Sequence, residues 1–177
     1  MVQLSTIFWT LIVLWGVIGF LRGYTRELVS AAGIILALFA TWQFDGVVLR
    51  PLLRGATAQQ QFWVYSGILS GITFFAYQTP AVAARIAARQ QASGRVGLQE
   101  RLLGLFFGAL NGYLFFGSIW YYLDVFQYPF PPFIYAPSPE SASAALVASL
   151  PLLWLVQNNL LTILVIVLFM FVLIAMI

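Results

Sequence analysis

Six charged residues, within segments 22–27 and 85–101, are the main candidates for chemistry, and we expect them to meet at one end of the fold. They are Arg22, Arg26, Glu27, Arg85, Arg89 and Arg101. The chain has no Cys, no His and no Lys, so thiolate and imidazole metal sites and lysine Schiff bases are excluded. The sequence therefore predicts a protein that is not an enzyme and holds no metal or cofactor.

Asn111 is the one strongly polar residue near the middle of an apolar run. Its amide could bond to a neighbouring helix, or it could contact a pore or a substrate. We place no ionisable residue in the middle of such a run, where a charge would be costly and functional by default. That pattern argues against a proton relay or a charge-coupled transporter.

The composition places these residues in a membrane. Hydrophobic residues make up 62% of the 177 residues and charged residues 7%, whereas soluble domains have about 25% charged residues. A soluble fold of this size could not hide so much apolar surface from water. The net charge of +3 is small and scattered, which argues against a nucleic-acid partner. The lipid bilayer is the expected surrounding.

Five apolar runs are long enough to cross a bilayer as α-helices. They cover residues 4–21, 28–44, 62–84, 101–123 and 151–177. The sequence thus predicts an all-α membrane protein of about five transmembrane helices, in which the short first connection makes the first two runs antiparallel neighbours. The alternative count is four, with the first hairpin re-entrant or the last run peripheral.

The intervening segments divide the chain into three parts. Residues 1–125 form a four-helix membrane bundle, in which 45–61 is an amphipathic interfacial piece and Pro80 kinks the third helix. Residues 126–150 form a Pro-rich, aromatic interfacial loop. Residues 151–177 form a C-terminal transmembrane helix that starts with a proline.

Charge and tryptophan predict the orientation. One set of alternate loops holds most of the arginines, and cytoplasmic loops are enriched in Arg and Lys. The N-terminus is therefore expected outside and the C-terminus in the cytoplasm. Four tryptophans fall at helix ends assigned to the outside, where indoles favour the interface; they are Trp42, Trp63, Trp120 and Trp154. Trp15 is the exception, because it lies in the middle of its run.

Small residues repeat at four-residue steps in the first four runs, and such stripes let membrane helices approach closely. The expected packing glycines are Gly16, Gly19, Gly23, Gly67, Gly71, Gly104, Gly108 and Gly112. The stripe on 101–123 could instead serve a homodimer or line a ligand groove. Residues 151–177 have almost no small residues, so this helix is expected outside the bundle, facing lipid or a membrane-protein partner.

The six charged residues named above, which we expect to form a cluster on the cytoplasmic surface, have two possible roles. Arginines at the ends of helices anchor them by the positive-inside rule. They could also bind anionic lipid headgroups or a partner's carboxylates.

Two segments resemble a known family. The run Gly19-Phe-Leu-Arg-Gly-Tyr-Thr-Arg-Glu27 is similar to the signature of the bacterial colicin V production protein family. The run Glu100-Arg-Leu-Leu-Gly104, followed by Gly108 and Gly112, is similar to its second motif. The resemblance covers about residues 5–125. It implies a four-helix protein of the bacterial cytoplasmic (inner) membrane, linked to toxin production or export and to envelope integrity.

The chain departs from the family pattern in three ways. Glu100 stands where the family often has Asp, and Asn111 stands where it often has a basic residue. Members of the family commonly end in a polar tail after four spans, whereas this chain continues into a fifth predicted helix.

Three functions remain open on this reading. The first is a non-enzymatic, family-like protein that supports toxin export or envelope homeostasis. The second is an accessory structural subunit of a larger photosynthetic or respiratory complex, docking through residues 151–177. The third is a channel or small transporter, which the lack of charge at mid-membrane disfavours.

Overall fold

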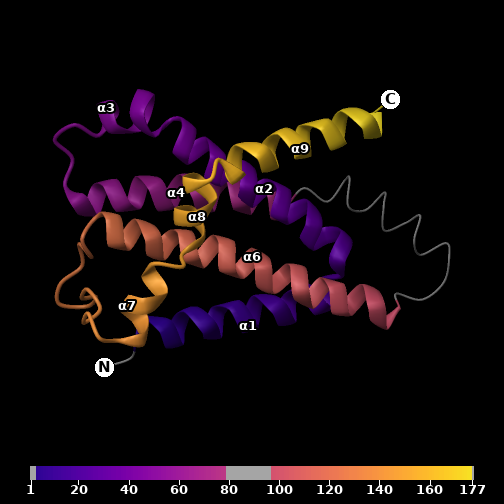
Figure 1. Ribbon diagram of the computed structural model, residues 1–177, viewed down its shortest axis with the longest axis horizontal. Coiled ribbons are helices and arrows are strands. Elements are labelled where there is room, and N and C mark those ends of the chain that lie inside the picture. The colour runs from indigo at the N-terminus through magenta and orange to yellow at the C-terminus, as the bar shows by residue number, and fades with distance from the viewer. Residues whose placement is uncertain (1–2, 79–96, 177) are drawn as a thin grey trace.

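The computed structural model describes residues 3–78 and 97–176, and these residues are helical apart from their turns and loops (Figure 1). The helices are α1 (Leu4–Arg22), α2 (Tyr24–Gln43), a short π-helix (Asp45–Leu49), α3 (Arg50–Leu52), α4 (Ala58–Gln78), α6 (Leu98–Val125), α7 (Ala142–Val147), α8 (Pro151–Gln157) and α9 (Leu160–Met176). Long helices satisfy their own backbone hydrogen bonds, which lipid cannot do. Pro80, Arg85 and Arg89 lie outside the described residues.

Three of these helices, α1, α2 and α6, are long and apolar enough to cross a membrane. A fourth crossing is added if residues 142–157 and 160–170, bent by 59° at their break, form one span. The predicted number of five is therefore not confirmed. With 21 residues α4 is long enough to span, but it falls outside this set and has three consecutive glutamines after its first residue, Ala58.

Helix α6 is the centre of the bundle. It packs along α1 on one side and against α2 on another, and α2 also packs against α4. The predicted pairing of α1 with α2 is wrong beyond their shared turn, because α1 lies along α6 instead (Figure 1). Gly23 makes that turn with φ +83, a conformation that other residues rarely adopt.

Glycine lets the backbones of α1 and α6 touch. A Cβ on Gly19 would lie 2.2 Å from the Gly104 carbonyl oxygen, and one on Gly108 would lie 2.5 Å from the Trp15 carbonyl oxygen. Gly112 also faces α1, where a Cβ would lie 2.8 Å from the Trp15 Cβ. Gly67 and Gly71 differ from these glycines, because no atom of residues 3–78 or 97–176 lies within 4 Å of a Cβ built on either one. Within these residues, their expected role in packing is not seen.

The C-terminal segment is broken rather than continuous as predicted. Asn159 has φ +52, and the chain turns there between α8 and α9. Pro151 and Leu155 of α8 are buried, and the Pro151 ring lies against Gly117 of α6. Leu161 at the start of α9 is fully buried, while Ile166 and Phe169 further along are exposed. Only the later part of this segment therefore has the peripheral character expected of it.

The connecting segments gather at opposite ends of the bundle. The turn at Gly23 lies against Glu100 near the start of α6. At the other end, the backbone N–H of Ser5 donates to the Ser143 hydroxyl, 3.1 Å away, which ties α1 to α7. The segment between α6 and α7 also folds back there, with Tyr128 buried against α6 (Figure 1).

Candidate functional site

Glu27 is an acidic side chain buried completely inside the helical bundle. It lies in the first turn of α2, because that helix begins at Tyr24 rather than at the predicted residue 28. Its exposed fraction is 0%. The expectation that Glu27 joins the surface charges is therefore wrong. A negative charge near a helix N-terminus is favoured by the helix dipole, which offsets part of the burial cost.

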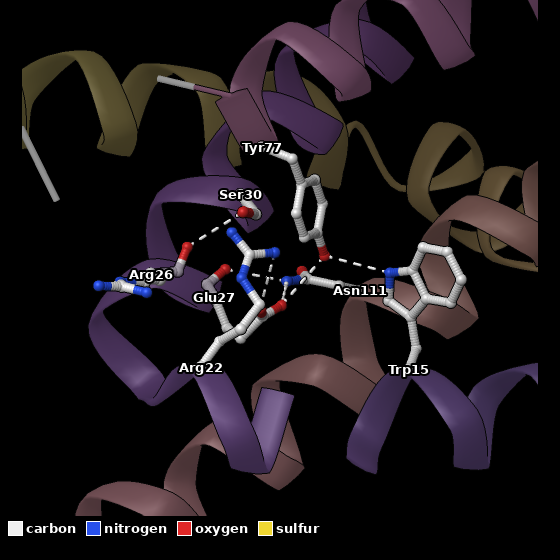
Figure 2. A network of polar contacts seen from close by, with 7 residues as sticks. All are labelled: Trp15, Arg22, Arg26, Glu27, Ser30, Tyr77 and Asn111. Carbon is white, nitrogen blue, oxygen red and sulfur yellow. Dashed lines mark hydrogen bonds and ion pairs between the residues drawn. The ribbon is translucent and has the colours of Figure 1, made fainter. Parts of the chain in front are cut away.

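Two side chains from other helices donate hydrogen bonds to one oxygen of this carboxylate (Figure 2). The Tyr77 hydroxyl of α4 donates to Glu27 Oε2 over 3.0 Å, and Asn111 Nδ2 of α6 donates to the same atom over 2.9 Å. Asn111 Nδ2 also donates to the Glu27 backbone carbonyl over 2.9 Å. Helices α2, α4 and α6 are thus joined at one carboxylate.

Helix α1 contributes two more side chains to this group of contacts, Arg22 and Trp15. Arg22 Nη1 lies 3.3 Å from Glu27 Oε1 as an ion pair, and its guanidinium lies 4.4 Å from the centre of the Tyr77 ring. The Trp15 indole N–H donates to the Tyr77 hydroxyl over 3.2 Å. We call Trp15, Arg22, Glu27, Tyr77 and Asn111 the Glu27 network.

The Glu27 network lies well inside the bundle. Gly23 is level with Gly104 of α6, whose Cβ would lie 3.0 Å from the Gly23 carbonyl carbon. Asn111 comes seven residues later on the same helix, and an α-helix rises about 1.5 Å per residue, so the amide lies roughly 10 Å further in. Arg22 connects this depth to the surface, because 26% of its side chain is exposed.

Two oxygens of the network receive no hydrogen bond from the part of the chain that the structure describes. They are the buried Glu27 Oε1 and Asn111 Oδ1, although Oε1 has the ion pair with Arg22. The orientation of the Asn111 amide is fixed, because its nitrogen faces two acceptor oxygens of Glu27. The hydrogen bonds of the network therefore leave two buried acceptor atoms unsatisfied.

The structure brings together only some of the residues singled out from the sequence. Arg22, Glu27 and Asn111 meet in the network, whereas Arg26 is exposed and points away from it (Figure 2). Arg101 is exposed as well, 5.9 Å from the centre of the Phe20 ring. Arg85 and Arg89 lie outside the described residues.

Sequence reasoning missed two members of the network. No local pattern singles out Tyr77, because its role depends on how α4 packs against α2 and α6. Trp15 did carry a signal, since it was the one tryptophan placed away from a helix end.

The two segments that carried the family resemblance meet in space. Gly19 touches Gly104 and Gly108, and a Cβ on Gly23 would lie 3.2 Å from Glu100 Oε1. Both segments are covered by the family model for the colicin V production protein, which matches residues 4–150. The chain belongs to the colicin V production protein family. No curated protein and no solved structure matches it.

The family match and the apolar helices make this colicin V production family member a multi-pass protein of a bacterial inner membrane. The match extends beyond the predicted residues 5–125 and includes the loop that follows α6. Helices α8 and α9 lie outside the match.

This family member also has a cavity of about 460 Å³ at the opposite end of the bundle from the Gly23 turn. Arg50 Nε lies 2.7 Å from Asp45 Oδ2 at its rim, and the Tyr65 hydroxyl donates to Asp45 Oδ1. The rest of the lining is mostly apolar or aromatic, with Trp42 and Phe126 among its side chains, and also includes the polar Thr41 and Gln61. Within the described residues, no three His, Cys, Asp or Glu side chains lie close enough to hold a metal ion.

Proposed function

We propose that this protein supports toxin export or envelope homeostasis in the bacterial inner membrane without catalysing a reaction. The Glu27 network is the part that does this work. Its residues come from four helices, so a change at Glu27 reaches α1, α2, α4 and α6 directly. That is a geometry for coupling helix positions, because the partners of Glu27 among the described residues lie on three other helices.

A single observation carries the proposal: the carboxylate of Glu27 is fully buried in an apolar helix bundle. An ionisable residue inside a membrane costs several kcal/mol unless it is paired. Well-packed apolar residues of similar volume are often as stable as a buried ion pair or more stable. The charge is therefore better explained by a function than by stability.

The proposal includes five crossings, with α4 as the third and α8 with α9 as the fifth. The N-terminus lies outside and the C-terminus in the cytoplasm. Support comes from the alternation of the connecting segments between the two ends of the bundle (Figure 1). The exposed Arg26 and Arg101 lie near the Gly23 end, as the positive-inside rule requires, and are available to anionic lipid headgroups.

The test is complementation in a bacterium that lacks its own family member. Colicin V release into the medium and exclusion of an apolar dye would be measured for the wild-type chain and for Glu27→Gln. We expect the wild type to restore at least one of the two and Glu27→Gln to reduce it several-fold at equal membrane abundance. Glu140→Gln, at an exposed acid toward the opposite end of the bundle, is the matched control. A wild-type chain that restores neither property refutes the proposal.

A second function, the accessory subunit of a larger membrane complex, is favoured by one feature of α9. Its outer surface is apolar and exposed at Ile163, Ile166, Val167 and Phe169, and it lies outside the family match. On this alternative, residues 151–177 bind a membrane-protein partner. Native electrophoresis of detergent extracts would then show the chain in a large complex that is lost when α9 is removed after Asn158. Migration of the intact chain by itself counts against it.

A further inference from the structure

We propose that the cavity of about 460 Å³ at the end of the bundle opposite the Gly23 turn binds one anionic phospholipid. Arg50 and Arg54 hold its phosphate, and side chains of α2, α6 and α8 contact its acyl chains. The site is separate from the Glu27 network, so this inference goes beyond the proposed function and does not depend on it.

Arg50 is held in place by Asp45, which leaves most of its donors available. Its Nε lies 2.7 Å from Asp45 Oδ2, and the Tyr65 hydroxyl donates to Asp45 Oδ1, so both carboxylate oxygens are engaged. A guanidinium has further N–H groups on its two Nη atoms. The Arg50 side chain is 76% exposed and pairs with no other acid among residues 3–78 and 97–176. Asp45 therefore orients a guanidinium whose remaining donors can bind an oxyanion.

Arg54 adds a second positive charge beside Arg50. The two arginines line a smaller cavity of about 210 Å³, which shares Arg50, Gln61 and Tyr65 with the larger one. Arg54 has no ion pair within the part of the chain that the structure describes. Among the described residues that line the two cavities, two are basic and one, Asp45, is acidic. This excess of positive charge selects an anion, and guanidinium groups match the oxygens of phosphate in geometry.

The larger cavity also has an apolar wall. Trp42 of α2, Val125 at the end of α6, and Leu152 and Val156 of α8 line this cavity but not the smaller one. Basic side chains thus lie toward the smaller cavity and apolar side chains away from it, as the two parts of a phospholipid require. Helix α8 lies outside the family match, so a segment that follows the matched residues completes the wall.

The surroundings of Arg50 favour a lipid over a soluble phosphate. Val47 and Leu52, which precede and follow Arg50 in the chain, are 78% and 73% exposed. A short helical segment with exposed apolar side chains and arginine lies in the membrane interface, at the level of the headgroups. Ligand cavities commonly have volumes of about 300 to 1,000 Å³. The volume of about 460 Å³ suits a headgroup and the first part of the acyl chains, while the rest of the chains stay in the bilayer.

The test is native mass spectrometry of the full chain in mild detergent, with equimolar phosphatidylglycerol and phosphatidylcholine of the same acyl chains. Phosphatidylglycerol has a net negative charge and phosphatidylcholine has none. We expect one phosphatidylglycerol per chain to be retained several-fold more than phosphatidylcholine. Glycerol 3-phosphate, which has the phosphate without the acyl chains, should not displace the lipid at the same concentration.

Arg50→Gln and Arg54→Gln should each weaken phosphatidylglycerol binding about fivefold, as expected for the loss of one arginine contact with an anionic lipid. Arg26→Gln is the matched control, because it removes the same charge from an exposed position at the other end of the bundle. Binding to this variant should equal binding to the wild type.

Val125→Trp and Val17→Trp form a second matched pair, because each valine is 47% exposed. The indole of Val125→Trp fills part of the cavity and should lower phosphatidylglycerol binding several-fold. Val17 lies on α1 and does not line the cavity, so Val17→Trp should bind like the wild type. This pair leaves the ion pair of Arg50 intact and tests the site even if the arginine variants do not fold.

Four outcomes overturn the inference. Equal retention of the two lipids shows that the site does not select an anion. Displacement by glycerol 3-phosphate at the same concentration assigns the site to a soluble phosphate. A loss in Arg26→Gln as large as that in Arg50→Gln shows general attraction to surface charge. Unchanged binding to Val125→Trp places the lipid outside the cavity.

Discussion

Asn111 Nδ2 donates to both the backbone carbonyl and the side-chain Oε2 of Glu27, 84 residues away in the chain, over 2.9 Å in each case. One amide therefore fixes both the position of α2 against α6 and the orientation of the buried carboxylate. The carbonyl of Glu27 is a further acceptor that the same amide satisfies. Removal of the amide would affect fold and site together.

Asn111→Leu should lower the stability of the purified protein. The leucine fills similar space but leaves Glu27 Oε2 with one donor fewer, which we expect to cost roughly 1 to 3 kcal/mol. Thermal unfolding in mild detergent, followed by circular dichroism, measures the loss. Gln99→Leu is the control, because this amide is exposed in the first turn of the same helix. Equal melting temperatures for the two variants would contradict the assigned role of Asn111.

Gly19→Ala should separate α1 from α6 and destabilise the bundle by at least 1 kcal/mol, as overpacking does. The new Cβ would meet backbone atoms of Gly104 and Gly108, which cannot move aside without moving the helix. Gly67→Ala is the matched variant, since its Cβ enters open space and alanine favours helix by up to about 1 kcal/mol. Denaturant unfolding of both proteins would compare them, and a Gly67→Ala loss as large as that of Gly19→Ala would refute this packing.

Some of this architecture is readable from the sequence because it depends on local spacing. Gly104, Gly108 and Gly112 lie on one helix face at four-residue intervals, and that face meets α1. Length and apolarity likewise predict α1, α2 and α6, whose bounds differ from the expected ones by a few residues.

The candidate site could not be predicted in this way. Which side chains point into the bundle depends on where each helix begins, and the sequence does not define these ends closely enough. Glu27 looks like a residue of a charged turn, but α2 begins at Tyr24, so Glu27 is carried onto the inner face of the helix with Ser30, Ala31 and Ile34. Tyr77 reaches it only through the packing of α4. The break at Asn159 was equally hidden, since asparagines near a helix start suit solvation as well as a turn with positive φ.

Alkaline pH should loosen the loop after α6. Burial raises the pKa of the Tyr128 hydroxyl to about 12, although the hydrogen bond from Trp120 lowers it. The neutral phenol thus stabilises the fold fully below its ordinary pKa of 10, and this stability is lost as the pH rises toward 12. Tyr128→Phe has no hydroxyl to ionise and so does not lose stability in this way. The difference in melting temperature by which Tyr128→Phe is less stable than the wild type should therefore shrink between pH 10 and 12.

Tyr135→Phe is the control for that titration, because Tyr135 is exposed in the same loop. Its stability should follow that of the wild type at each pH. A Tyr128→Phe deficit that stays constant or grows above pH 10 would contradict the assignment.

The orientation can be tested with single cysteines, since the natural chain has none. Ser138→Cys lies in the exposed loop between α6 and α7, and Gln99→Cys lies in the exposed first turn of α6, at the opposite end of the bundle. With the N-terminus outside, a membrane-impermeant maleimide added to intact spheroplasts should label Ser138→Cys several-fold more than Gln99→Cys. Lysis should make the two labelling levels equal. The reverse preference before lysis would invert the topology and would place the Gly23 turn on the outer side of the membrane.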